Sequence, residues 1–84
     1  MKRLVYSDHA LGQMIERGTT REEVREAIEK GEIAPAKKGR HAYRLNFQYE
    51  KLWGGKYYRI KQVMPVVKEE EREICVITVY VFYF

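Results

Sequence analysis

Residues 7–31, "SDHALGQMIERGTTREEVREAIEKG", carry two helical patterns separated by only a short break. The apolar residues of each pattern fall on one helical face, at Ala10, Leu11, Met14 and Ile15 and then at Val24, Ala27 and Ile28. Ser7 is placed to cap the first helix, and Gly18 supplies the left-handed residue that ends it. Thr20 and Glu23 stand in capping-box spacing at the start of the second helix. The segment therefore predicts a helical hairpin with a tight turn.

Strand patterns lie on both sides of this hairpin. Alternating or continuous apolar residues predict strands at 2–6, 42–49, 57–67 and 74–83. Gly54 and Gly55 mark a turn between the middle two, and the last strand is apolar on both faces, which is typical of a central strand. Pro65 has no amide N–H, so its strand should end there, bulge, or lie at an edge. The order β-α-α-β-β-β predicts a single α+β domain over residues 1–84, with the helical hairpin packed on an antiparallel sheet.

Composition narrows the class of protein. The chain of 84 residues is long enough for one domain, and its single cysteine, Cys75, cannot form an internal disulfide, which favours a reducing cytoplasm. The N-terminus lacks a signal-peptide pattern, and the longest apolar run, at 74–84, is too short for a membrane helix. The two histidines and the cysteine lack the spacing of a metal site. We expect a soluble cytoplasmic protein with no metal and no cofactor, and the abundance of Glu, Lys, Arg and Tyr favours a thermophilic source.

The charge of this basic protein is segregated along the chain. The net charge is +4, and residues 37–61 hold eight cations against one carboxylate, Glu50. The acidic residues collect instead at 22–32 and 69–73. Such a basic segment favours an anionic partner, RNA or another nucleic acid above all.

The first candidate site is a polar stripe on the first helix. His9, Gln13, Glu16 and Arg17 are spaced to share one helical side next to the apolar stripe. Histidine is the usual general acid–base at neutral pH, so this stripe is a candidate for catalysis. The alternative is that it is simply the solvated side of an amphipathic helix.

The second candidate site lies on the strands. If the strands at 42–49 and 57–67 pair, Arg44, Arg59 and Lys61 should share the sheet face opposite the helices, within reach of Thr78 and Tyr80. Cations beside a tyrosine hydroxyl suit a phosphodiester, whose transition state gains negative charge and whose leaving oxygen needs a proton. The basic loop at 37–41 adds three candidate phosphate ligands, Lys37, Lys38 and Arg40. The alternative for both groups is a solvated, positively charged surface.

Several motifs resemble a known family. These are S-D-H-A at 7–10, M-I-E-R-G at 14–18, E-E-V-R-E-A-I-E-K-G-E-I at 22–33 and I-T-V-Y at 77–80. They resemble a family of short prokaryotic domains of unknown function that is similar to the RelE/ParE toxin superfamily, whose minimal fold is also β-α-α-β-β-β. The family pattern marks Ser7, His9, Ala10, Glu16, Arg17, Gly18, Gly31, Thr78 and Tyr80, and often has arginine where this chain has Gln13.

The resemblance implies an activity, although ParE-like proteins act on DNA gyrase and the fold alone does not fix the function. In RelE-like ribonucleases the catalytic cations and a terminal aromatic or histidine come from the sheet, where Arg44, Arg59, Lys61 and Tyr80 are the nearest counterparts by strand position. We therefore expect a metal-independent endoribonuclease, the toxin of a toxin–antitoxin pair. Its catalytic residues would be His9, Glu16, Arg17, Lys61 and Tyr80, and its RNA-binding residues Lys37, Lys38, Arg40, Arg44, Arg59 and Thr78.

Two alternatives stay open. In the first, the chain is a non-catalytic module whose basic surface binds nucleic acid or an acidic protein segment, and His9 is structural. The second concerns assembly, because "VYVFYF" at 79–84 places apolar side chains where a homodimer seam or an antitoxin segment would cover them.

Overall fold

Both helices form where the sequence predicts them, in a computed structural model that describes residues 2–84. Helix α1 spans Asp8–Arg17, and the side chain of Ser7 accepts a hydrogen bond from the Ala10 amide at its start. Helix α2 spans Arg21–Lys30 and begins with the predicted capping box of Thr20 and Glu23. Neither helix is long and apolar enough to cross a membrane, and no other helix occurs within residues 2–84.

The sheet has five strands, one more than predicted. They are β1 (Arg3–Tyr6), β2 (Glu32–Ala34), β3 (His41–Trp53), β4 (Lys56–Glu69) and β5 (Glu73–Tyr83), and they lie side by side in the order β1-β5-β4-β3-β2. The prediction of a wholly antiparallel sheet is wrong, because β1 pairs with β5 in parallel. The two strands are joined through the rest of the domain rather than by a hairpin, so their relative direction is not set by a turn. The extra strand, β2, is only three residues long, too short for an alternating pattern to reveal it.

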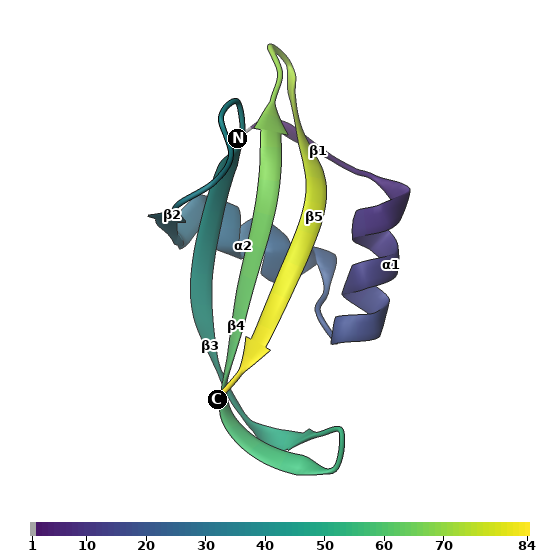
Figure 1. The fold of residues 1–84 in the computed structure, drawn as a ribbon, viewed down its shortest axis with the longest axis vertical. Helices are drawn as coiled ribbons and strands as arrows, with labels where there is room; N and C mark the ends of the chain where they lie inside the picture. Colours follow the sequence, from purple (N-terminus) through teal and green to yellow (C-terminus); the bar gives the residue numbers. More distant parts are fainter. Residues whose placement is uncertain (1) are drawn as a thin grey trace.

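The helices cover the sheet in different ways (Figure 1). Helix α2 crosses behind β3 and β4, whereas α1 stands beside β5, past the point where β1 has ended. The buried core between helices and sheet consists of Ala10, Met14, Val24, Ala27, Val63, Val67, Ile74, Val76 and Val79. This arrangement leaves the other side of the sheet, which faces the viewer in Figure 1, turned away from α2.

We call that other side the open face. The strand register places on it Ala42, Arg44, Asn46 and Gln48 from β3, Ile60, Gln62, Met64 and Val66 from β4, and Thr78, Tyr80 and Phe82 from β5. Its residues alternate along each strand with those that face the core.

The β3–β4 hairpin is longer than the rest of the sheet and curls under the end of β5 (Figure 1). The register shifts between Gln48 and Lys51, where Glu50 has a φ of 52°, and an irregularity of this kind bends a strand. Pro65 does not end its strand: it lies buried in the middle of β4 opposite Val79, and the register shift falls at the next residues along.

Candidate nucleic-acid interface

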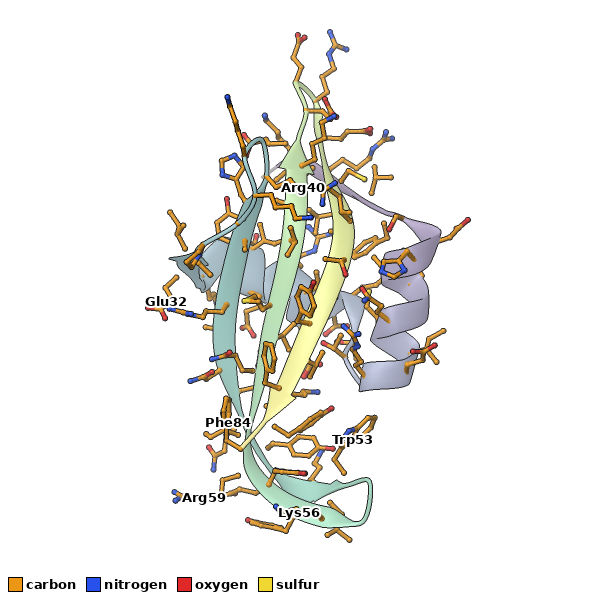
Figure 2. All side chains as sticks on the ribbon, in the orientation of Figure 1. Glu32, Arg40, Trp53, Lys56, Arg59 and Phe84 are labelled. Carbon is orange, nitrogen blue, oxygen red and sulfur yellow. The ribbon has the colours of Figure 1, made fainter. Side chains whose placement is uncertain are left out.

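A pocket on the open face brings together residues of the basic loop at 37–41 and of the last strand, both of which the sequence predicts to bind RNA. Its volume is about 210 Å³, and it is lined by Pro35, Ala36, Lys37, Arg40, Met64, Val66, Thr78 and Tyr80. The loop between β2 and β3 supplies the two cations, and Figure 2 shows Arg40 lying in front of the sheet. The floor is apolar, from Met64 and Val66, while Thr78 and Tyr80 add hydroxyl groups. We call this the open-face pocket; it combines positive charge, the Tyr80 side chain and an apolar surface within one hollow, while the Thr78 hydroxyl donates to Gln13.

Arg17 lies next to this pocket. Its Nη1 donates to the carbonyl oxygen of Val79 at 2.8 Å, and its guanidinium carbon lies 5.5 Å from the centre of the Tyr80 ring. The contacts fix a cation beside an aromatic ring that lines the pocket. The sequence analysis places Arg17 in the stripe on the first helix and Tyr80 on the strands; in the structure the two side chains meet, with Arg17 approaching from the edge of β5.

Two polar side chains of α1, and the residue that caps it, hydrogen-bond to β5. The carboxamide oxygen of Gln13 accepts hydrogen bonds from the Thr78 hydroxyl and the Val79 amide, and the Ser7 hydroxyl donates to the carbonyl oxygen of Ile77. Together with Arg17, these side chains hydrogen-bond to the edge of β5 where β1 no longer pairs with it. Unpaired strand edges invite association with other chains, so α1 protects this one.

His9 and Glu16 occupy the same flank of α1 as Gln13 and are exposed. Because Gln13 contacts Thr78, a residue of the open face, this flank is the one turned toward the open face. His9 precedes Gln13 by one helical turn and does not line the open-face pocket. The imidazole therefore lies outside the open-face pocket.

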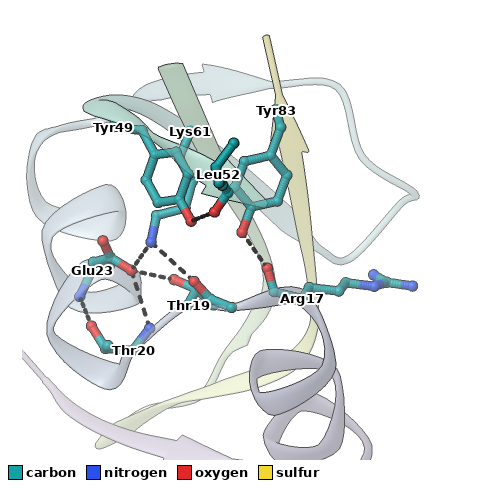
Figure 3. Close-up of polar contacts among 9 residues, drawn as sticks. Arg17, Thr19, Thr20, Glu23, Tyr49, Leu52, Lys61 and Tyr83 are labelled. Carbon is teal, nitrogen blue, oxygen red and sulfur yellow. Dashed lines mark hydrogen bonds and ion pairs between the residues drawn. The ribbon is translucent and has the colours of Figure 1, made fainter. Parts of the chain in front are cut away.

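Lys61 is not where the sequence places it, and the prediction that it lies opposite the helices is wrong. Its side chain is only 8% exposed and faces the core side, where Nζ donates to Glu23 Oε1 at 2.8 Å and to the Gly18 carbonyl oxygen at 3.0 Å (Figure 3). The reason is that β4 carries apolar residues on both faces. Alternation predicts which residues share a side of the strand but not which side faces the helices. In the structure Val63 and Val67 face the core, whereas Met64 and Val66 lie on the open face.

The remaining predicted cations are dispersed. Arg44 lies on the open face as expected, where its Nε pairs with Glu32 at 2.7 Å. Arg59 is exposed at the other end of the sheet from Arg40 (Figure 2). Because its neighbour Ile60 lies on the open face, alternation places Arg59 on the opposite side, and the prediction that it shares a face with Arg44 is wrong. Lys38 is exposed in the loop before β3. The structure thus brings only Lys37 and Arg40 into the pocket with Thr78 and Tyr80.

An aromatic cluster that the sequence does not reveal holds the hairpin tip against the helical turn. The ring of Tyr83 stacks on Trp53 with centroids 5.1 Å apart and also contacts Tyr49 and Tyr58, at 5.3 and 5.5 Å. Its hydroxyl donates to the carbonyl oxygen of Arg17 at 2.6 Å (Figure 3). Burial raises the pKa of Tyr83 to about 12, and the nearby Tyr49 and Glu23 add to the rise. Trp53 therefore packs within the domain, against Tyr83.

Among residues 2–84, no group of three or more His, Cys, Asp or Glu side chains gathers in a way that could hold a metal ion. The chain matches one family model, described as Domain of unknown function (DUF4258), over residues 6–81. Neither the curated proteins nor the solved structures compared with it contain a match.

Proposed function

The chain belongs to the family described as Domain of unknown function (DUF4258), and we propose that it binds single-stranded RNA on the open face, with a backbone phosphate in the open-face pocket. The observation that carries this proposal is the convergence of Lys37, Arg40 and Tyr80 over an apolar floor. Lysine and arginine supply the attraction for phosphates, and the apolar floor suits a base.

The distribution of charge supports the same face. A second hollow over α2, behind the sheet, is lined by four carboxylates and two cations, and Lys30 pairs with Glu26 there; its charged residues are Glu22, Glu23, Arg25, Glu26, Glu29 and Lys30. Carboxylates therefore outnumber cations on that side of the domain, whereas Arg17, Lys37 and Arg40 attract phosphates to the other. An RNA strand is therefore steered toward the open face.

Binding is tested with a fluorescent single-stranded RNA and a charge-removing variant. Arg40→Ala should weaken binding about tenfold and lower the slope of log affinity against log salt by about one, as expected for the loss of one phosphate contact. Arg25→Ala, which removes an exposed guanidinium from α2, is the matched control and should leave the affinity unchanged. Equal affinities for the two variants would refute the placement of the RNA.

A second candidate function, metal-independent cleavage of that RNA, rests on the position of His9. In this reaction the 2′-oxygen bonds to the adjacent phosphorus while the bond from phosphorus to the 5′-oxygen breaks, which leaves a 2′,3′-cyclic phosphate and a 5′-hydroxyl. His9 would accept the proton of the 2′-hydroxyl, the Tyr80 hydroxyl would donate one to the leaving oxygen, and Arg17 would stabilise the charge on phosphorus. Glu16, on the same flank of α1, would orient the imidazole.

Cleavage would make the chain a RelE-like toxin, the activity that its resemblance to the RelE/ParE superfamily implies, with an acidic antitoxin as its partner. The test is incubation with RNA in the presence of a chelator. We expect the parent to cut, and His9→Ala to bind RNA equally well but cut at least about 100-fold more slowly, as expected for loss of a general acid–base. If His9→Ala cuts as fast as the parent, its assigned role is wrong. If the parent binds but does not cut, the chain is an RNA-binding module.

A further inference from the structure

β5 and the residue after it carry a row of exposed aromatic side chains, of which only Tyr80 lines the open-face pocket. Tyr80, Phe82 and Phe84 occupy alternate positions and are 40%, 42% and 61% exposed. The rings of Tyr80 and Phe82 are nearly parallel, at 15°, with centroids 6.3 Å apart. Phe84 continues the row because its amide donates to the carbonyl oxygen of Ile60 on β4. We call these three residues the aromatic row.

We infer that the aromatic row stacks successive bases of the RNA strand whose phosphate lies in the open-face pocket, an inference that rests on the proposed function. Aromatic faces stack on any base, so they bind single strands with little sequence preference. The strand spacing keeps adjacent rings apart, since alternate residues are separated by about 6.6 Å. Each ring therefore receives its own base, as in an extended strand whose bases no longer stack on one another.

The neighbouring strands supply polar groups beside the row. Gln62 on β4 lies directly opposite Phe82, and its Nε2 donates to Oδ1 of Asn46 on β3 at 2.9 Å. These two amides form a pair next to the ring on which a base would stack. Carboxamides of Asn and Gln recognise base edges through paired hydrogen bonds, so this position is the one at which the row would distinguish bases.

Cations lie at the Tyr80 end of the aromatic row. Arg17 lies over the Tyr80 ring, and Lys37 and Arg40 line the pocket beside it. At the other end the contact is between backbones: the Arg59 amide donates to the carbonyl oxygen of Phe84 at 2.8 Å, and alternation with Ile60 turns the Arg59 side chain away from the open face. Figure 2 shows Arg40 and Phe84 toward opposite ends of the sheet. Aromatic faces that continue from a group of cations match an anionic strand with exposed bases, whereas an apolar protein segment would leave these charges without counterions.

The experiment measures how affinity depends on RNA length. Oligoribonucleotides of about two and about nine nucleotides are titrated into the parent and into Phe82→Leu, which keeps an apolar side chain but removes the stacking face. The pocket itself needs no more than the dinucleotide, so the informative quantity is the ratio of the two affinities. We expect the nonamer to bind the parent much more tightly than the dinucleotide, and Phe82→Leu to reduce that ratio about tenfold.

Two control variants, together with Arg40→Ala, separate the possible outcomes. Phe82→Tyr keeps the ring and should retain the ratio, and Ile15→Ala, which truncates a side chain that is 83% exposed on α1, should also have no effect. If Phe82→Leu leaves the ratio unchanged while Arg40→Ala still lowers the affinity for both oligomers, the aromatic row does not stack bases. The proposed function is then unaffected. If neither oligomer binds the parent, both proposals fail; a dimer in sedimentation that Phe82→Leu dissociates would then assign the row to self-association.

Discussion

Replacing Lys61 by methionine should destabilise the fold by about 2–4 kcal/mol while leaving RNA affinity unchanged. The ammonium group is buried and makes a hydrogen bond to the carboxylate of Glu23 and another to the carbonyl oxygen of Gly18. Losing a hydrogen bond to a charged group costs about 1.5–3 kcal/mol, and leaving the carbonyl unpaired costs about another 1 kcal/mol. Two things moderate the sum: Glu23 is 23% exposed and keeps its bonds to Thr19 and Thr20, and methionine retains most of the apolar stem.

The measurement is urea unfolding followed by the fluorescence of Trp53, the sole tryptophan, which stacks on Tyr83 at the site that Lys61 supports. Glu23→Gln and the double variant complete a cycle, and we expect the two single effects to exceed the double effect by at least about 1 kcal/mol. The reasoning is refuted if Lys61→Met unfolds within about 0.5 kcal/mol of the parent. A folded Lys61→Met that loses RNA affinity would instead restore Lys61 to the phosphate-binding role that the sequence suggests.

Three further predictions concern the contacts between α1 and the sheet. Gly18→Ala should cost at least about 2 kcal/mol in urea unfolding, because Gly18 has a φ of +79° and a Cβ there would lie 2.7 Å from an aromatic ring; Gly12→Ala, with nothing within 4 Å, should be neutral or stabilising. The pKa of Tyr83 is about 12 in the fold, against 10.0 for free tyrosine, so the stability that this hydroxyl contributes below pH 10 is lost as the pH rises through 12. In Tyr83→Phe the free energy of unfolding should therefore fall less steeply between pH 10 and 12 than in the parent. Gln13→Leu should cost about 1–3 kcal/mol and speed hydrogen exchange at the Val79 amide, since that amide loses its acceptor; unchanged exchange would contradict the assigned contact.

Local signals account for the parts of the fold that the sequence predicts correctly. The caps at Ser7 and Thr20 and the left-handed Gly18 depend on residues within one turn of each helix end, so they set the helix limits regardless of tertiary structure. Alternation likewise predicts β3 and β4. The parallel pairing of β1 with β5 and the three-residue β2 depend on contacts distant in sequence, which no local pattern contains.

The candidate site was harder to predict because it depends on which face of a strand meets the helices. Along β4 both faces are apolar enough to form the core, so the pattern cannot decide between Val63 and Met64, and Lys61 is placed on the wrong side. Lys37 and Arg40 reach the pocket because the loop after β2 folds back over the open face, and the sequence marks that loop only as basic. That Thr78 and Tyr80 share a face was predictable because they alternate along one strand.

The structure also narrows the question of whether the polar stripe of α1 is structural or functional. Beyond Tyr6, β5 has no neighbouring strand on that side, and a helix must supply hydrogen bonds to its edge. Gln13 and Arg17 do so, which gives them a structural reason to be polar. Edge protection does not account for His9, which stays exposed on the flank turned toward the open face. An amphipathic helix requires only some polar residue at that position, so His9 is the residue of the stripe on which the proposed cleavage depends.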